Sequence, residues 1–539
     1  MQSIGLPFHH PLAFWLGCVL ISAGVFAHIP MFVHASHMGY RMVGMPMDAT
    51  MLTGMGLIPV GLLLAWYALM PRLAHLRRDN HTGPIHFHVA DNAALNRKHW
   101  TLVLALLVAV MVDVMKPATL GFVMPGITVE YGITQSFAGV LALVALAGTA
   151  VGSVIWGRMA DLQGRRSAIL LSALIFIGTA ICGAMPTFQW NLVMCFLMGM
   201  SAGGLLPITF TLMAEMIPAA HRGWLLVALG GVGTSGGYLL ASGAAAMLEP
   251  VFSWRILWML GLPTGMLVIF LNRYIPESPR FLASVGLRRE ARAVLNRYNG
   301  EIIPDGEDQL AEEEMKADPA GFRQMLRGPY ARITLGLVGS GLAWGLVNFG
   351  FLLWLPTNLR SMGMSAEVAN GLLAQSGLLA VPGVVLVIWL YHFWSSIYTL
   401  VLFVALTAAS LALFFIFGLL QMNSGAVIII VTALLLISAS GVIAMLIPYA
   451  AEIYPVHLRG TGAGVVAASS KAGGIAGALC GVLGLFGDLA LSALLLAVPL
   501  VVFGTLLFRS GIDTRGLRLE QIHAKVVRKS EGRGTSEGH

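Results

Sequence analysis

Charge is scarce in this sequence. Only 11% of its 539 residues are Asp, Glu, Lys or Arg, whereas soluble globular domains carry about 25%. Hydrophobic residues make up 57%, and apolar runs of about 20 residues, long enough to cross a hydrocarbon core of roughly 30 Å, recur along most of the chain. The composition therefore excludes a water-soluble protein and predicts an all-α integral membrane protein.

Cysteine and the signatures of common enzymes are scarce or absent. The four cysteines lie in apolar runs, which excludes a disulfide framework and a CxxC metal site. No P-loop, nucleophile elbow or HExxH motif is present, so we expect no ATP-driven step, no enzyme activity, no cofactor and no metal. The net charge of +7 is spread between the apolar runs, and we expect no nucleic-acid partner.

The apolar runs divide into fourteen predicted spans. The first segment has no basic n-region and no small-residue cleavage site, so we expect a retained anchor. The predicted organisation is two extra helices in 1–71, a linker in 72–99, a six-helix half in 100–272, a central loop in 273–332, a second half in 333–508 and a tail in 509–539. The predicted spans are 12–34, 51–71, 101–126, 136–156, 167–185, 190–213, 223–248, 255–272, 333–356, 367–391, 397–420, 425–450, 460–484 and 488–508.

The distribution of basic residues predicts the orientation of the spans. With the N-terminus in the cytoplasm, all but five of the 32 Lys and Arg residues fall in cytoplasmic segments, as the positive-inside rule requires. We therefore expect N- and C-termini on the cytoplasmic side of a cell inner membrane. The five exceptions are Arg41, Lys116, Arg255, Arg360 and Lys471.

An internal repeat supports two related halves. The pattern ExxPxxxRG occurs twice, offset by 237 residues, each time after the fourth span of a half and before the fifth. A transporter duplicated as two parallel halves requires this placement. The charged residues of the two copies are Glu215 and Arg222, and Glu452 and Arg459.

The sequence GRMADLQGRR at 157–166 resembles the signature loop between the second and third helices of the major facilitator superfamily, and the resemblance covers about Trp100 to Arg509. It implies twelve helices in two pseudo-symmetric halves, transport by alternating access, and a cytoplasmic latch at this loop. The equivalent loop at 390–397 has lost its acidic and basic residues, so we expect a one-sided latch. The candidate latch residues are Gly157, Arg158, Asp161, Gly164, Arg165 and Arg166.

Two further motifs indicate the branch of the family. The sequence PESPRFL at 276–282, with Glu277 and Arg280, resembles the motif of sugar porters and related metabolite and organic-ion carriers. DVMK at 113–116 resembles the DGYD element of bacterial proton-coupled aromatic-acid and metabolite carriers, with Lys116 in place of the second acid. In the fourth span, Cys195 stands where the family element normally has arginine. Residues 287–298 are predicted to form an amphipathic helix at the cytoplasmic interface.

Charges inside spans mark the candidate transport site, because each costs at least about 2.5–3.5 kcal/mol near a helix centre. Asp113 and Lys116 lie three residues apart on one helical face. They either neutralise each other as a structural pair or face a central cavity, where Asp113 exchanges a proton and Lys116 attracts an anion. Lys471 has no acidic residue nearby in the sequence, which favours a cavity-facing role. Asn348 and Gln375 either bind solute or pack between helices.

The two extra helices carry His and Met residues around their connecting loop. Such side chains bind soft metals, but no strict ligand spacing is present, so anchoring or packing against the transporter is the alternative. Because the family resemblance begins near Trp100, we expect residues 1–71 to be dispensable for transport. The stretch 72–99 is expected to be a solvated linker.

These features predict a secondary transporter for proton-coupled uptake of a small organic anion. Its expected partners are the solute, protons and the lipid bilayer. The alternatives are a sugar or organic-cation porter, or a non-transporting nutrient sensor with the same fold.

Overall fold

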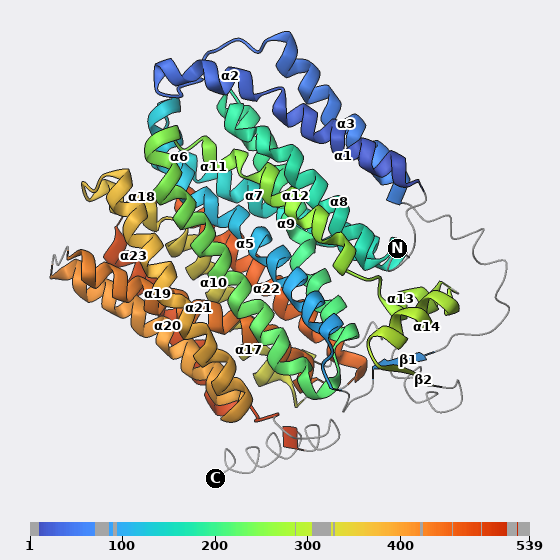
Figure 1. Cartoon of the computed structure of the whole chain (residues 1–539). Coiled ribbons are helices and arrows are strands. Elements are labelled where there is room, and N and C mark those ends of the chain that lie inside the picture. The colour runs from blue at the N-terminus through green and yellow to red at the C-terminus, as the bar shows by residue number, and fades with distance from the viewer. Residues whose placement is uncertain are drawn as a thin grey trace. The chain divides into compact units, whose positions relative to one another are not determined.

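The computed structural model describes most of the chain (Figure 1). Fourteen helical runs among the described residues are long and apolar enough to cross a membrane, which confirms the predicted number of spans. The predicted all-α membrane fold is also confirmed, with one short two-stranded sheet added to it. The described residues are 10–69, 86–89, 94–285, 287–303, 325–326, 329–420, 424–454, 456–486, 488–514 and 525–526.

Residue contacts group the chain into two compact units, which are described separately. Unit 1 comprises Met1–Arg222, Gly237–Asp308 and Met364–Asn370, and unit 2 comprises Gly223–Gly236, Gln309–Gly363 and Gly371–His539. Unit 1 therefore contains the two extra N-terminal helices as well as most of the first six-helix half.

Unit 1 is built mainly from long apolar helices. The extra helices α1 and α3 pack on each other and lie beside α8 (Figure 1). Its elements are α1 (Pro11–Phe26), α2 (Ile29–His34), η1 (Ala35–Met38), α3 (Ala49–Leu69), β1 (His86–Val89), α5 (Arg97–Tyr131), α6 (Gln135–Ala138), α7 (Val140–Gln163), α8 (Arg165–Gly178), η3 (Thr179–Ala184), α9 (Phe188–Met216), α10 (Ala219–Phe252), α11 (Ile256–Met259), α12 (Gly261–Leu271), η4 (Asn272–Tyr274), α13 (Pro279–Ser284), α14 (Arg288–Arg297) and β2 (Gly300–Ile303).

The central helix of unit 1, α5, begins and ends at capping signals. Asn96 precedes it and accepts hydrogen bonds from two backbone N–H groups of the first turn, which are otherwise without partners at a helix start. Gly132 ends it in the left-handed conformation, with φ of 64°. We name the two ends of unit 1 by their contents: the motif end carries residues 157–166 and Glu277, and the loop end carries residues 35–48.

Part of the expected solvated linker is structured at the motif end. Strand β1 pairs antiparallel with β2, with His86 opposite Ile303 and Val89 opposite Gly300. Just before α5, the Asn96 side-chain amide donates a hydrogen bond of 2.8 Å to the Arg297 carbonyl. The linker is therefore attached to the segment that follows α12.

The predicted amphipathic helix at 287–298 corresponds to α14. Its apolar residues Ala291, Val294 and Leu295 are buried, while Arg289 and Arg292 are exposed. α14 packs on α13, so protein already covers its apolar face. The helix is amphipathic as expected, but that face is not available to a membrane interface.

Unit 2 consists mainly of the helices of the second half. One of them is interrupted by a π-helical turn, η5, a feature often found at functional sites. The elements are α17 (Ala331–Leu346), η5 (Val347–Leu352), α18 (Leu355–Ser361), α19 (Ala366–Phe393), α20 (Ser396–Leu419), α21 (Gly425–Ile453), α22 (Val456–Val482) and α23 (Leu489–Ser510). Residues Gly223–Gly236 of α10 also group with unit 2, and the start of α19, up to Asn370, groups with unit 1.

Candidate functional site

An ion pair lies in the middle of α5. The Lys116 Nζ atom is 3.3 Å from Asp113 Oδ1, and the exposed fractions of the two residues are 2% and 5%. The ammonium group also lies 3.9 Å from the centre of the Phe176 ring of α8. The favourable attraction of a cation to an aromatic face therefore adds to the charge pairing.

The ion pair faces the interior of unit 1. Helix α10 approaches α5 at Gly237, next to Val114 and Met115. At 100° per residue, Asp113 and Lys116 lie on the opposite face of α5, toward α8. The two charges are thus enclosed by helices of the same unit, where removing either one would leave the other buried without its charge partner.

The other predicted transport residues lie in unit 2. Lys471 is half-buried on α22, close to the place where Gly345 of α17 meets the backbone of α22 at Ser470. Asn348 is half-buried in the π-helical turn η5, and Gln375 is exposed on α19. Lys471 and Asn348 therefore remain candidate solute-binding residues on two helices that pack together. Gln375 lies on a third helix and is exposed.

The motif end of unit 1 is organised around Glu277. Its two carboxylate oxygens accept hydrogen bonds from the backbone N–H groups of Arg165 at 2.8 Å and Arg166 at 3.2 Å, the first residues of α8. Gly164 precedes them with φ of 101°, and a side chain there would overlap the Glu277 carboxylate. Glu277 therefore caps α8 and requires glycine in the signature loop.

The environment of Glu277 also changes its protonation. Burial raises the pKa of this carboxyl from 4.5 to about 7, although hydrogen bonds from Ser278, Arg165 and Arg166 and the charge of Arg165 act in the opposite direction. A group with this pKa titrates near neutral pH.

Arg165 links the signature loop to the repeated motif. Its guanidinium lies 3.3 Å from Glu215 and 3.5 Å from Asp161. Asp161 has 74% of its side chain exposed, so water weakens its pairing, and the more enclosed Glu215 is the stronger partner. Arg166 instead donates to the Asn272 side chain at 2.6 Å.

The remaining motif residues have less enclosed positions. Arg222 is partly buried and donates a hydrogen bond of 3.3 Å to the Ile217 carbonyl. Gly157, Arg158 and Arg280 are exposed. Arg459 lies on α22, and its side chain is outside the described set.

Unit 2 contains a carboxylate arrangement that the sequence did not reveal. Asp513, just after α23, accepts hydrogen bonds from the Ser396 backbone N–H at 3.1 Å and from its hydroxyl at 3.0 Å, at the first residue of α20. Glu452 of the repeated motif accepts from Thr514 at 2.6 Å and Tyr391 at 3.3 Å.

These contacts give each half a carboxylate cap at the corresponding helix, while the one-sided latch stays a prediction. In unit 1 a carboxylate after the sixth helix of the half, Glu277, caps the third helix of that half, and in unit 2 Asp513 caps α20 in the same way. The unit 2 loop lacks charged partners of its own, but Ser396 supplies hydrogen-bond donors. The signal was present in the sequence, because Asp513 lies 236 residues after Glu277, close to the repeat offset of 237.

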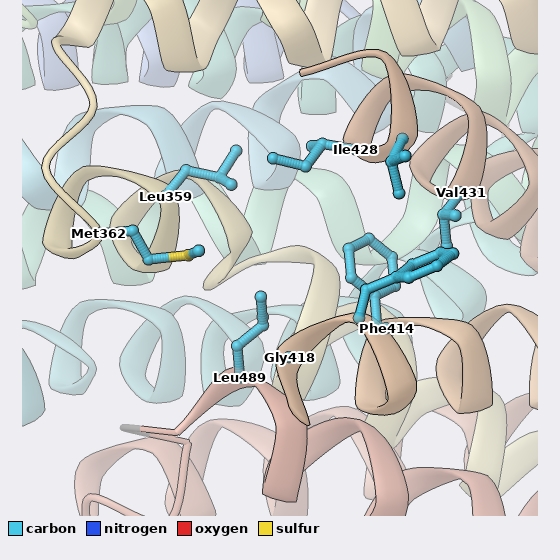
Figure 2. A pocket seen from close by; sticks show the side chains of 9 residues that line it. Leu359, Met362, Phe414, Gly418, Ile428, Val431 and Leu489 are labelled. Atoms are coloured by element: carbon cyan, nitrogen blue, oxygen red, sulfur yellow. The ribbon is translucent and has the colours of Figure 1, made fainter. Parts of the chain in front are cut away.

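An apolar pocket of unit 2 lies where α18, α20, α21 and α23 end or begin (Figure 2). Leu359, Met362, Phe414, Ile428 and Leu489 are among its lining residues, and none of the nine carries a charge. A carboxylate solute needs polar partners when it leaves water. This pocket therefore does not suit the expected solute.

The fold and the buried charges define a membrane transporter with two related six-helix halves. The family description "Major Facilitator Superfamily" matches residues 102–511, and the chain belongs to this family. The family match leaves the N-terminal helices α1 and α3 outside it.

Individual relatives and solved structures agree with this assignment. The chain is 28% identical over 392 residues to the niacin transporter NiaP of Acinetobacter baylyi, covering 72% of this chain and 87% of the relative. It is 31% identical over 303 residues to the 4-hydroxybenzoate transporter PcaK of the same organism, covering 54% and 65%. The fold resembles the xylose transporter XylE from E. coli, with a TM-score of 0.62 and 16% identity over 78% of this chain and 100% of XylE.

The titration of Glu277 predicts a pH-dependent stability. The pKa of Glu277 is higher in the folded protein than in the unfolded chain. Its contribution to the free energy of unfolding is therefore present at low pH and is lost as the pH rises through about 7. In thermal unfolding of purified protein, the melting temperature of wild type should fall relative to Glu277→Gln as the pH rises from about 4.5 to about 7, and the difference should level off above that pH. Glu290→Gln, at a half-buried position of α14, is the control and should follow wild type. Parallel curves for wild type and Glu277→Gln would contradict this assignment.

Proposed function

We propose that this protein takes up a small organic acid together with a proton, and that an aromatic carboxylate is the preferred solute. The relatives named for niacin and 4-hydroxybenzoate support the solute class. Alternating access between two halves is the accompanying mechanism. In this proposal the motif end faces the cytoplasm of a cell whose inner membrane holds the protein, and both termini are cytoplasmic, in line with the basic residues.

The buried Asp113–Lys116 pair is the observation that carries the proposal. When Asp113 is ionised, it neutralises Lys116 at 3.3 Å. When Asp113 takes up a proton, the enclosed Lys116 ammonium loses its countercharge, which is costly in a low-dielectric interior. A solute carboxylate can then supply the missing negative charge. Proton binding and anion binding therefore favour each other, and the coupling is reciprocal.

Lys116 also accounts for a departure from the family pattern. The element of the fourth span that normally begins with arginine has Cys195, which is buried on α9. We propose that Lys116 supplies, from the same helix as Asp113, the positive charge that is missing at position 195. The short separation of three residues keeps this charge next to the acid.

An aromatic pair on the face of α5 that meets α10, opposite the ion pair, offers contacts for a ring. Phe122 of α5 and Tyr238 of α10 have ring centres 5.9 Å apart. The Tyr238 hydroxyl is enclosed and has no hydrogen-bond partner among the described residues. A buried hydroxyl without a partner is costly, and a bound oxygen atom of the solute would satisfy it. We propose that Tyr238 contacts the solute.

Uptake into proteoliposomes tests the solute class. With an inward proton gradient, niacin, 4-hydroxybenzoate or a similar aromatic carboxylate should accumulate faster than pentoses, hexoses or organic cations. Preferential uptake of a sugar or a cation would replace the proposed solute class. Saturable binding of a solute without uptake or counterflow would instead indicate a sensor.

Tyr238→Phe is the matched variant for this assay because it keeps the ring and removes the hydroxyl. It should raise the KM for the accumulated acid about tenfold, the order expected when a buried hydrogen bond is lost, and leave the maximal rate nearly unchanged. Tyr398→Phe, at an exposed position on α20, should resemble wild type. Equal KM values for Tyr238→Phe and wild type would remove Tyr238 from the site.

Substitution of the ion pair distinguishes coupling from a structural role. Asp113→Asn should abolish proton-driven uptake but retain solute exchange, because binding and reorientation persist without a titrating group. Lys116→Met keeps the apolar stem beside Phe176 and should raise the KM for the anion about tenfold or more. The double variant should not regain proton-driven accumulation.

A purely structural pair gives a different pattern. Each single variant would then leave one buried charge, costing about 3–5 kcal/mol, and would insert or fold poorly. The double variant would recover both expression and full proton-driven uptake. That recovery would contradict the proposed coupling role.

A further inference from the structure

A second buried ion pair lies at the loop end of unit 1. Arg255 is 0% exposed, and its guanidinium meets both carboxylate oxygens of Glu130, with the shortest contact 2.7 Å. Trp254 donates to the same carboxylate at 3.0 Å. Arg255 also donates to the carbonyls of Gly183 and Met185, each at 3.0 Å. This cluster joins the end of α5 to η3 and to the connection between α10 and α11.

The backbone at this connection is strained. Ser253, which separates α10 from the ion-pair residues, has φ of 64°. A side chain other than glycine in such a conformation costs about 1–3 kcal/mol unless its surroundings hold it. The bonds of Trp254 and Arg255 to Glu130 provide that restraint. The end of α10 thus depends on the Glu130 cluster.

The loop between the extra helices completes this cluster. The Met42 backbone N–H donates a hydrogen bond of 2.8 Å to Glu130 Oε1, the oxygen that also meets Arg255. Met42 itself is 0% exposed. A segment outside the family match therefore binds directly to a buried carboxylate of the family core.

Apolar packing holds the same loop in place. Met31, Met42 and Met51 are buried together with Ala184 of η3, and Phe252 and Met259 of unit 1 pack against them. The Tyr40 ring lies 6.0 Å from the Phe252 ring at the end of α10. The methionines of the extra helices thus fill a core shared with the transporter helices, as flexible thioether side chains do well.

The extra helices are held to each other by a close glycine contact. A side chain at Gly54 of α3 would come within 2.7 Å of the Gly24 carbonyl and of Ala27 in the preceding helix segment. The hairpin also contacts the sixth helix of the first half. The ring centres of Trp15 of α1 and Phe270 of α12 are 6.5 Å apart. The hairpin therefore contacts the family helices at α12 as well as at its loop.

We propose that residues 35–48 are an obligatory clamp on the Glu130–Arg255 cluster, and that the α1–α3 hairpin is a structural part of the amino-terminal half. The surface formed by η3, α11 and the end of α10 is the docking site for this loop. The end of α10 also carries the buried Glu249, which accepts a hydrogen bond of 2.6 Å from Asn370 at the start of α19. Loosening the clamp therefore disturbs transport as well as stability.

Two glycines of α3 provide a matched test in the full-length protein. Gly54 faces α1, whereas a side chain at Gly56 would meet nothing within 4 Å. Gly54→Leu should lower the melting temperature by about 5 °C or more and slow solute uptake about tenfold, or prevent stable insertion. Gly56→Leu adds the same side chain and should match wild type.

Two substitutions of Met42 separate packing from the hydrogen bond. Met42→Ala removes the buried side chain but keeps the backbone N–H, whereas Met42→Pro removes both. Uptake by Met42→Pro should be at least about fivefold slower than uptake by Met42→Ala, with a lower melting temperature. The melting temperatures do not depend on the identity of the solute, so this test stands apart from the proposed function.

The proposal has clear contrary outcomes. If Gly54→Leu matches Gly56→Leu in melting temperature and uptake, the hairpin is a separable anchor. If Met42→Pro matches Met42→Ala, the loop does not hold Glu130. Either result overturns the clamp and restores the expectation that residues 1–71 are dispensable.

Discussion

A charge buried among apolar helices must keep its partner, and three centres of this protein follow that constraint. Lys116 is paired with Asp113 inside unit 1, Arg255 with Glu130 at the loop end, and Glu277 with the start of α8 at the motif end. Isolated ions in such surroundings would cost several kcal/mol each. Each centre therefore ties together the helices that contribute to it, and any change in its protonation or pairing acts on those helices.

The three centres differ in what can change them. Arg255 has two carboxylate contacts and two carbonyl acceptors, so it is suited to holding helix ends together. Lys116 is held by Asp113 and an aromatic ring, and a proton on Asp113 removes its countercharge. Glu277 is held by backbone donors and titrates near neutral pH. Structural restraint, solute coupling and sensitivity to cytoplasmic pH are the corresponding proposed roles.

The sequence predicted the features that depend on local patterns. Apolar runs identified the spans, and a separation of three residues on one helix placed Asp113 beside Lys116. Pairings between distant segments were missed. Glu130 and Arg255 are 125 residues apart, and Arg255 was singled out only as an exception to the positive-inside distribution of basic residues. Strand β1 was missed because its partner is a four-residue strand beyond the sixth helix of the first half. The attachment of the extra helices was also missed. A family pattern describes only the segments that its members share, and the match begins at residue 102, after these helices.

Proton coupling through Asp113 is the central claim, and proton uptake on solute binding tests it directly. The purified protein is mixed at about pH 7 with the anion that it transports, in weakly buffered solution, and the pH change is recorded. Wild type should take up about one proton per bound solute, because binding of the anion favours protonated Asp113. Asp113→Asn should bind the anion without taking up this proton. Equal proton uptake by wild type and Asp113→Asn would contradict the account.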